Sequence, residues 1–210
     1  MKVHLIHPFR FNLRADWTKI LKDVDTLLKF ENRLKKFCDT DTDHLTEDEK
    51  GDKVRTFLGD GFEVFVEMLL KSHPYDRHIG VSHYKPCHPQ FGNADHGVDG
   101  FGIGTNNHPA TVQAKFRGDV TAELTANGSH LVNFKNSSHE EYNVLMSDVD
   151  NMLIVTNCKG LHHYTASAML NNKVRCIARD HLKQLVDDNL PFWDEFRRAT
   201  QQITAPSIAI

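Results

Sequence analysis

Two short β-prone runs joined by a turn-rich connection constrain the fold of this chain most strongly. The runs cover residues 98–103 and 110–116, and the segment between them reads Gly-Thr-Asn-Asn-His-Pro, a composition typical of turns. Together they predict an antiparallel β-hairpin. Because side chains alternate between the two faces of a strand, Gln113 and Lys115 point to the same face. The hairpin therefore presents two neighbouring polar side chains on one side of a sheet.

A carboxylate joins this polar face if the two strands pair, because Asp99 lies on the first strand. Mg²⁺ prefers oxygen ligands and retains several waters when it binds to protein. The side chains of Asp99 and Gln113 and the backbone carbonyl of Ala114 offer such oxygens. Lys115 is placed to orient or deprotonate a water bound to the ion. The hairpin thus predicts a site for a metal ion and a reactive water.

Two amphipathic helices are predicted before the hairpin. Apolar residues recur at helical spacing over 16–37, and Thr46 with Glu49 forms a capping box that predicts the start of a second helix. Glu63 lies amid apolar neighbours on this second helix. It is the candidate for a further acidic group at the metal site, with Glu67 one turn later as its competitor.

Strands and helices alternate after the hairpin, as in α/β proteins. The periodicity predicts a helix over 140–149, a buried strand over 152–156, a helix over 164–170, a strand over 174–177 and a C-terminal helix from Asp180 that breaks near Pro191. The segment 72–95, before the hairpin, carries three of the seven prolines. It predicts a loop with at most one short strand.

Composition and charge exclude several classes of protein. Lys and Arg number 25 against 28 Asp and Glu, giving a formal charge of −3, so any polyanion site must be local. No apolar stretch is long enough to span a membrane, and we expect no membrane partner. The four cysteines occur without a C-x-x-C pair, which is typical of reduced thiols in a cytoplasmic compartment.

Two further groups of side chains have alternative interpretations. The basic clusters are candidate DNA-backbone contacts or solvated surface; they comprise Arg33, Lys35 and Lys36 and the pair Arg197–Arg198. The histidine-rich segment has spacings permissible for zinc but lacks a C-x-x-C half; it contains His73, His78, His83, Cys87, His88 and His96. We expect these imidazoles to contact phosphate or to lie on a solvated loop.

Five segments, in this order, resemble the PD-(D/E)XK nucleases and, among them, the Mrr-type restriction endonucleases. The matching segments are G-x-x-F-E-x-F-V-x-x-L-L at 59–70, D-x-G-V-D-G at 95–100, V-Q-A-K at 112–115, I-V-T-N at 154–157 and a strand–helix pair over 174–185. The resemblance implies an α/β fold with a restriction endonuclease-like core, in which helices flank a mixed central sheet, and an N-terminal helical extension.

The same resemblance implies a role for each residue of the candidate site. Asp99 and Gln113 would bind Mg²⁺, for which Mn²⁺ is a plausible substitute, and Lys115 would assist the attacking water. Glu63 would support the site, directly or through a water. Glutamine at the second metal position departs from the Glu or Asp of the wider family and agrees with the Mrr-type branch.

The expected organisation is a helical arm over 1–45, a nuclease-like domain over 46–200 and a tail over 201–210. The expected activity is Mg²⁺-dependent hydrolysis of DNA phosphodiester bonds by a restriction-type or site-specific endonuclease. Cutting both strands of a duplex needs two sites, which favours a C2 homodimer over a nicking monomer. The alternatives are a Holliday-junction resolvase or other structure-selective nuclease, an RNA-directed nuclease, and a DNA-binding module that does not cut.

Overall fold

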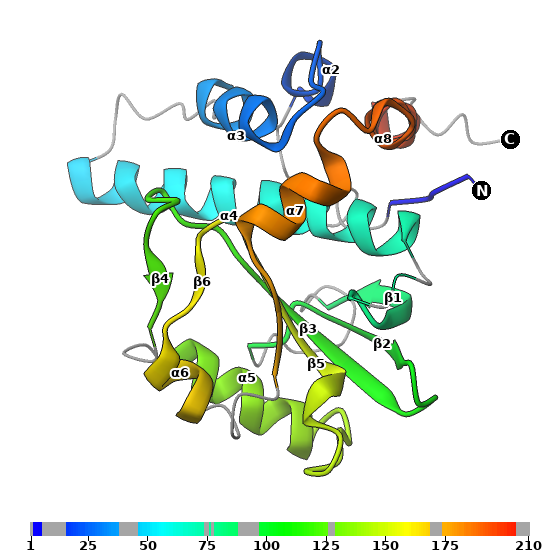
Figure 1. Ribbon diagram of the computed structural model, residues 1–210. Helices are drawn as coiled ribbons and strands as arrows, with labels where there is room; N and C mark the ends of the chain where they lie inside the picture. The colour runs from blue at the N-terminus through cyan, green and yellow to red at the C-terminus, as the bar shows by residue number, and fades with distance from the viewer. Residues whose placement is uncertain are drawn as a thin grey trace, which may run out of the picture. The chain divides into compact units, whose positions relative to one another are not determined.

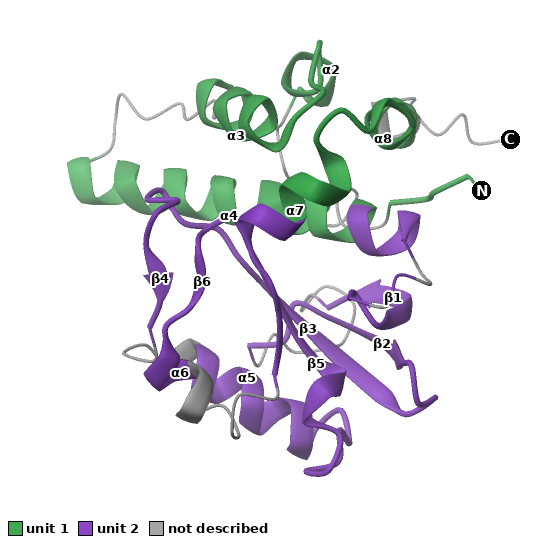
Figure 2. Cartoon of the chain, viewed as in Figure 1, with its two compact units in different colours: residues 1–68, 182–210 green, residues 69–181 purple. Residues whose placement is uncertain are grey.

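The computed structural model of the chain divides into two compact units (Figures 1 and 2). Residues 1–68 and 182–210 form the first unit, and residues 69–181 form the second. The structure describes residues 2–5, 16–37, 46–73, 76, 78–87, 97–125, 129–168 and 174–204. The predicted arm, domain and tail, with boundaries after residues 45 and 200, stay a prediction.

The first unit is helical. Its elements are α2 (Trp17–Ile20), α3 (Leu27–Lys36), most of α4 (Glu47–Ser72), the end of α7 (Arg179–Val186) and α8 (Leu190–Thr204). The capping box predicted at the start of α4 is present. The Thr46 N–H donates to Glu49 Oε2 at 2.9 Å, and the Glu49 N–H donates to Thr46 Oγ1 at 3.4 Å. These bonds satisfy backbone donors that the first turn of a helix leaves open.

The single helix predicted over 16–37 is wrong, because the structure has two helices there. The chain turns between them, where Asp23 adopts a left-handed backbone conformation with φ of 57°. Thr26 then begins a new helix, since its side-chain oxygen accepts the backbone N–H of Lys29 at 3.2 Å. Apolar spacing alone did not show this interruption, because α2 and α3 each bury an apolar face with helical spacing.

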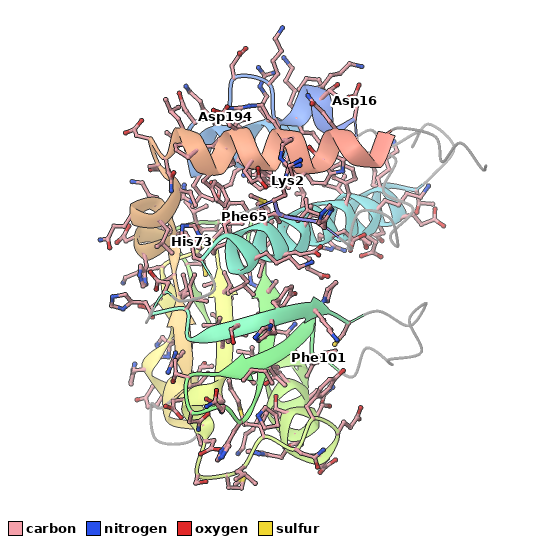
Figure 3. The ribbon with its side chains drawn as sticks, turned by 90° about the vertical axis from the view of Figure 1, so that its right-hand side faces the viewer. Lys2, Asp16, Phe65, His73, Phe101 and Asp194 are labelled. Atoms are coloured by element: carbon pink, nitrogen blue, oxygen red, sulfur yellow. The ribbon has the colours of Figure 1, made fainter. Side chains whose placement is uncertain are left out.

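Aromatic side chains from α3, α4 and α8 form the core of the first unit. Phe65 on α4 lies at the centre of the cluster (Figure 3), with its ring centroid 5.2 Å from that of Phe30, 6.1 Å from Trp193 and 6.4 Å from Phe196. All four rings are fully buried. Large aromatic side chains bury more apolar area than other residues, so this cluster is the main apolar contact between α3, α4 and α8.

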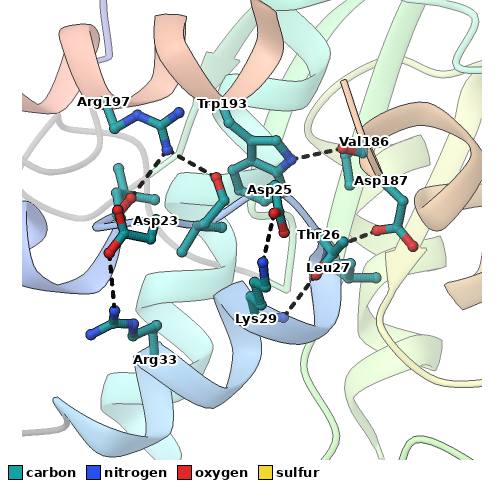
Figure 4. A network of polar contacts seen from close by, with 12 residues as sticks. Asp23, Asp25, Thr26, Leu27, Lys29, Arg33, Val186, Asp187, Trp193 and Arg197 are labelled. Carbon is teal, nitrogen blue, oxygen red and sulfur yellow. Dashed lines mark hydrogen bonds and ion pairs between the residues drawn. The ribbon is translucent and has the colours of Figure 1, made fainter. Parts of the chain in front are cut away.

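Arg197 joins α8 to the turn between α2 and α3 (Figure 4). Its Nη1 donates to the carbonyl oxygens of Leu21 and Val24 at 3.2 and 2.9 Å, and its Nη2 contacts Asp194 at 2.7 Å. The guanidinium thus supplies donors to two backbone carbonyls of the turn that follows α2. One member of the predicted Arg197–Arg198 phosphate cluster is therefore used within the fold.

Arg198, the second member, forms an ion pair within the same unit. Its Nε donates to Glu195 Oε2 at 2.7 Å, and the backbone N–H of Val3 donates to Glu195 Oε1 at 2.6 Å. The Arg198 guanidinium, followed by the Val3 N–H, lowers the pKa of Glu195 to about 2. Glu195 thus attaches the N-terminal segment to α8.

We expect Glu195→Gln to destabilise the chain in a pH-dependent way. The folded pKa of about 2 lies below the ordinary value of 4.5, so the charge stabilises the fold above pH 4.5 and less as pH falls toward 2. Near pH 7 the substitution should lower the free energy of unfolding by about 1 kcal/mol, after allowing for solvent screening. Urea denaturation near pH 7 and near pH 3 measures this difference.

The exposed Glu140, at the end of a helix in the other unit, provides the matched control. Glu140→Gln should leave the free energy of unfolding unchanged at both pH values. An equal loss for Glu195→Gln near pH 3 and near pH 7 would contradict the electrostatic explanation.

The second unit is built on a mixed sheet with the strand order β1-β2-β3-β5-β7. The strands are β1 (Val81–Pro86), β2 (Gly100–Gly104), β3 (Pro109–Lys115), β5 (Met152–Thr156) and β7 (Arg175–Ile177). Strands β1, β2 and β3 are antiparallel, which confirms the predicted hairpin. Strands β3, β5 and β7 are parallel. The predicted α/β class, with a mixed central sheet flanked by helices, is confirmed.

Helix α5 (Ser129–Glu140) covers the face of the sheet that carries the odd-numbered side chains of β3. The hydroxyls of Thr111 on β3 and Ser138 on α5 lie 2.8 Å apart. Phe134 of α5 packs in one buried cluster with Met152 and Ile154 of β5. Smaller elements complete the unit: β4 (Glu123–Leu124) and β6 (Gly160–Leu161), which pair in parallel, α6 (His163–Ala168) and a 3₁₀ turn (Val149–Asn151).

The helix predicted over 140–149 is wrong: α5 ends at Glu140, where that helix was expected to begin. Asn143, with φ of 56°, lies in the turns that follow. The strand predicted over 152–156 is confirmed without change. The C-terminal break occurs at Asp188, with φ of 57°, and Pro191 lies inside the first turn of α8, where a missing N–H costs no hydrogen bond.

The three cysteines within the described ranges are free thiols. Cys87 and Cys158 are buried. Burial, followed by the neighbouring Cys158, raises the pKa of the Cys176 thiol to about 12, so this thiol stays protonated and unreactive. Cys38 lies outside the described residues.

Across the described helices, none combines the length and the apolar character that a bilayer crossing requires.

Candidate functional site

Asp99, directly before β2, lies beside Gln113 of β3. The first residue of β2, Gly100, pairs with Val112, the residue before Gln113. The Asp99 N–H donates to the Val112 carbonyl at 3.0 Å, and the Cys87 N–H donates to the Asp99 carbonyl at 2.9 Å. The backbone of Asp99 is therefore held from both sides, by the residue that follows β1 and by a residue in the middle of β3.

The side chains of this pair are bonded to each other. The Gln113 amide nitrogen Nε2 donates to Asp99 Oδ2, and the backbone N–H of Ala114 donates to the same oxygen at 2.7 Å. Asp99 is 8% exposed and Gln113 is fully buried. A carboxylate removed from water needs such donors, because burial without them is costly. Asp99, Gln113 and Ala114 thus lie together in the structure through two N–H donors, and the binding of a metal ion by their oxygens stays a prediction.

Two glycines beside Asp99 have structural reasons to be glycine. Gly97 has φ of 89°, a conformation that other residues rarely adopt. Gly100 lies against Tyr84, and a side chain there would collide with the tyrosine ring. The Tyr84 hydroxyl in turn donates to the Asp99 carbonyl at 3.4 Å. The G-x-D-G pattern therefore fixes the backbone on both sides of the carboxylate.

The second oxygen-bearing group, Gln113 Oε1, is buried and has no hydrogen-bond partner within the described part of the chain. The orientation of the amide is set by Asp99, since only a nitrogen donor fits opposite a carboxylate oxygen. A buried acceptor without a donor costs about 1–3 kcal/mol. A hard divalent cation is the kind of partner that such an oxygen lacks.

The backbone carbonyl of Ala114 points to the same edge of β3 as the N–H that Asp99 accepts, because both groups of a strand residue face one neighbour. Asp99, Gln113 and this carbonyl therefore fit the oxygen donor set of Mg²⁺ or Mn²⁺. No group of three or more His, Cys, Asp or Glu side chains is arranged for a metal within the described ranges. An ion here would take its other ligands from amide and carbonyl oxygens and from water.

Lys115 lies at the end of β3 and is partly exposed. It follows Gln113 by two residues, so the two side chains leave the same face of the strand about 7 Å apart. Its ammonium makes no hydrogen bond or ion pair with other described residues. The Lys115 side chain therefore leaves β3 on the same face as Gln113, with no ion-pair partner among the described residues.

Sequence reasoning missed a set of contacts just beyond Lys115. The Thr156 hydroxyl donates to the Lys115 carbonyl at 2.8 Å. The Asn157 side chain accepts the Arg117 N–H at 2.6 Å and donates to the Arg117 carbonyl at 2.9 Å. The available signal was the Thr-Asn pair at the end of a buried strand, because ligand sites of parallel sheets lie where strands end.

Glu63 lies on α4 in the helical unit, whereas Asp99, Gln113, Ala114 and Lys115 belong to the other unit. Its side chain is partly exposed, and that of the competitor Glu67 is fully buried. The support of the site by Glu63, directly or through a water, stays a prediction.

The histidine-rich segment is described only in part. His73 Nδ1 bonds to the Leu69 carbonyl at 3.0 Å, and the His78 ring packs edge-on against His181 at 4.8 Å. His88 and His96 lie outside the described residues. The phosphate contacts expected of this segment stay a prediction.

Comparison with known proteins identifies no relative of this chain. No protein-family model, no curated protein and no solved structure matches the chain significantly.

Proposed function

We propose that this chain is a Mg²⁺-dependent DNA endonuclease of the PD-(D/E)XK type, close to the Mrr-type branch. One observation carries the proposal: a buried Asp99–Gln113 pair leaves Gln113 Oε1 without a partner among the described residues, and Lys115 extends from the same face. The order of α4, the antiparallel β1–β2–β3, α5 and the parallel β5 supports a restriction endonuclease-like core.

Each residue of the pair has a separate task in the proposed reaction. Asp99 contributes the negative charge, and Gln113 and the Ala114 carbonyl contribute neutral oxygens, to a cation site. A bound Mg²⁺ supplies a Lewis acid for the phosphate and lowers the pKa of a bound water. The Lys115 ammonium donates hydrogen bonds that orient the attacking water and stabilise the negative charge that develops on the phosphate.

Cleavage of supercoiled plasmid DNA tests the proposal. We expect nicked or linear product with Mg²⁺ or Mn²⁺, no product with EDTA, and binding without cleavage with Ca²⁺, which accepts a looser ligand geometry. Light scattering on the same preparation tests the proposed C2 homodimer. Absence of cleavage with both Mg²⁺ and Mn²⁺, across linear duplex, four-way junction and RNA substrates, would overturn the nuclease proposal.

We expect Gln113→Glu to make the fold dependent on divalent cations. The substitution removes the Nε2 donor and places a second carboxylate opposite Asp99, so repulsion should lower the free energy of unfolding by about 2 kcal/mol without metal. Mn²⁺ should restore more stability to this variant than to the wild type, because binding to the folded state alone is stabilising. Thermal melting with EDTA and with Mn²⁺ measures both effects.

The exposed Gln184 on α7 provides the matched control for this substitution. Gln184→Glu should melt as the wild type does, with or without Mn²⁺. A variant at Gln113 that melts at the same temperature with EDTA and with Mn²⁺ would argue against a cation site at the pair.

A further inference from the structure

A side chain continues the ladder between β3 and β5 past the point where the strands end. The last backbone pair of the ladder is Lys115 with Thr156. One step further, the carboxamide of Asn157 bonds to both backbone groups of Arg117, at 2.6 Å to the nitrogen and 2.9 Å to the oxygen. A carboxamide carries a donor and an acceptor in one plane, as a peptide group does, and so replaces the missing strand residue.

Asn157 is itself anchored to the start of α7. Its side chain is fully buried. The Asn157 carbonyl accepts Nη1 of Arg179 at 3.0 Å, and the backbone N–H of Arg179 donates to the Cys158 carbonyl at 2.9 Å. The start of α7 therefore holds Asn157 in place, and the Asn157 carboxamide in turn holds the residues that follow β3.

Lys115 is held between two of these contacts. Its carbonyl accepts the Thr156 hydroxyl at 2.8 Å, and Arg117, two residues later, is held by Asn157. Without the second contact, Arg117 loses the bonds that hold it to the residue after β5, and among the described residues the next backbone hydrogen bond between these two segments is that of Ala122 with Lys159. A displacement of about 1 Å at a reacting group is enough to lower a rate by up to about 100-fold.

We propose that Asn157 is a positioning residue for Lys115. Through the peptide of Arg117, its carboxamide keeps the end of β3 in register with β5, so that the lysine ammonium stays beside the Asp99–Gln113 pair. This inference rests on the proposed nuclease function, because the task of Lys115 comes from it. Asn157 touches neither the substrate nor the cation.

Asn157→Asp is the most selective test of this role. The aspartate keeps the shape of asparagine and the acceptor for the Arg117 N–H, but it replaces the donor by an oxygen that faces the Arg117 carbonyl. A second asparagine, which directly precedes β5, provides the matched control. Asn151, 1% exposed, donates through Nδ2 to Asn106 Oδ1 at 2.9 Å and to the Pro109 carbonyl at 3.1 Å.

Asn151 and Asn157 lie at opposite ends of β5 and are equally buried, so the same substitution should destabilise the fold comparably at both positions. Only Asn157→Asp should affect Lys115. We expect it to lower the kcat of plasmid cleavage by about 10- to 100-fold with KM for DNA changed less than about twofold. We expect Asn151→Asp to keep the wild-type kcat below its melting temperature.

Amide hydrogen exchange supplies a readout that does not depend on cleavage. The Arg117 amide should exchange about tenfold faster or more in Asn157→Asp than in the wild type, and at the wild-type rate in Asn151→Asp. If Asn157→Asp fails to fold, the smaller and neutral Asn157→Ser provides the same comparison.

The outcomes separate the inference from the proposed function. Wild-type protein that cuts DNA, together with an Asn157→Asp variant that keeps its kcat, overturns the positioning role alone. Equal losses of kcat in the variants at Asn151 and Asn157 also overturn it, because they reflect general destabilisation. A wild type that does not cut any nucleic acid overturns the nuclease proposal and the positioning role with it.

Discussion

Asp99→Asn is expected to slow DNA cleavage by about 100-fold or more, with the fold retained. Asparagine has the shape of aspartate and keeps an oxygen that accepts the Ala114 N–H, which now lies 2.7 Å from Asp99 Oδ2. It removes the only negative charge of the Asp99–Gln113 pair, and with it the main attraction for a divalent cation. Loss of a single charge-stabilising group in other enzymes costs a comparable factor in rate.

Single-turnover cleavage of plasmid DNA at saturating Mg²⁺ measures this effect, and titration calorimetry with Mn²⁺ measures the accompanying loss of cation affinity. The control is Asp180→Asn, which changes an exposed aspartate at the start of α7 and should leave both quantities unchanged. Cleavage by Asp99→Asn at the wild-type rate would remove Asp99 from the site.

Lys115→Met is expected to slow cleavage by about 100-fold or more without reducing cation affinity. Methionine fills a similar volume, but it has no charge and no donor with which to orient a water or stabilise a developing anion. The lysine ammonium makes no bond with other described residues, so its removal should leave the free energy of unfolding within about 0.5 kcal/mol of the wild type.

The two variants therefore differ in one measurable respect: Asp99→Asn loses affinity for Mn²⁺ and Lys115→Met keeps it. Lys135→Met on α5, which alters a lysine that is also partly exposed, controls for the loss of one positive charge from the unit. A Lys115→Met variant that loses Mn²⁺ affinity to the same degree as Asp99→Asn would contradict the separate tasks proposed for the two residues.

The hairpin and the pair it carries could be predicted from the sequence because they depend on local rules. A turn-rich segment fixes the loop of a hairpin, and strict alternation fixes which side chains share a face. These rules place Gln113 and Lys115 on one face and Asp99 near that face. Strand β5 was predicted without error for a similar reason, since a short apolar run between polar segments is typical of a buried strand.

Helix α5 could not be predicted because its stabilisation comes from packing. Its sequence is rich in Ser, Asn and His, and few apolar residues mark its buried side, among them Leu131 and Phe134. Tertiary packing against the sheet stabilises such a helix more than its own propensity does. The apolar residues of 140–149 gave a stronger periodic signal, although that segment forms turns.

The role of Asn157 could not be predicted either, because its bonds join residues that are 40 positions apart in the sequence. A motif can indicate that an asparagine follows a strand, but the partner of its amide depends on which strand lies beside it. Here the parallel pairing of β3 with β5 decides the partner. Long-range register of this kind is a property of the folded sheet.

The amide of Gln113 has a consequence for how this chain folds. Where two carboxylates face each other, repulsion opposes hairpin formation until a counter-ion arrives. Here a neutral donor bridges to Asp99, so the β2–β3 hairpin can reach its final geometry during synthesis in the absence of any ion. We therefore expect the chain to mature as a stable, inactive protein whose activity begins with the supply of divalent cations, with no accompanying rearrangement of the sheet.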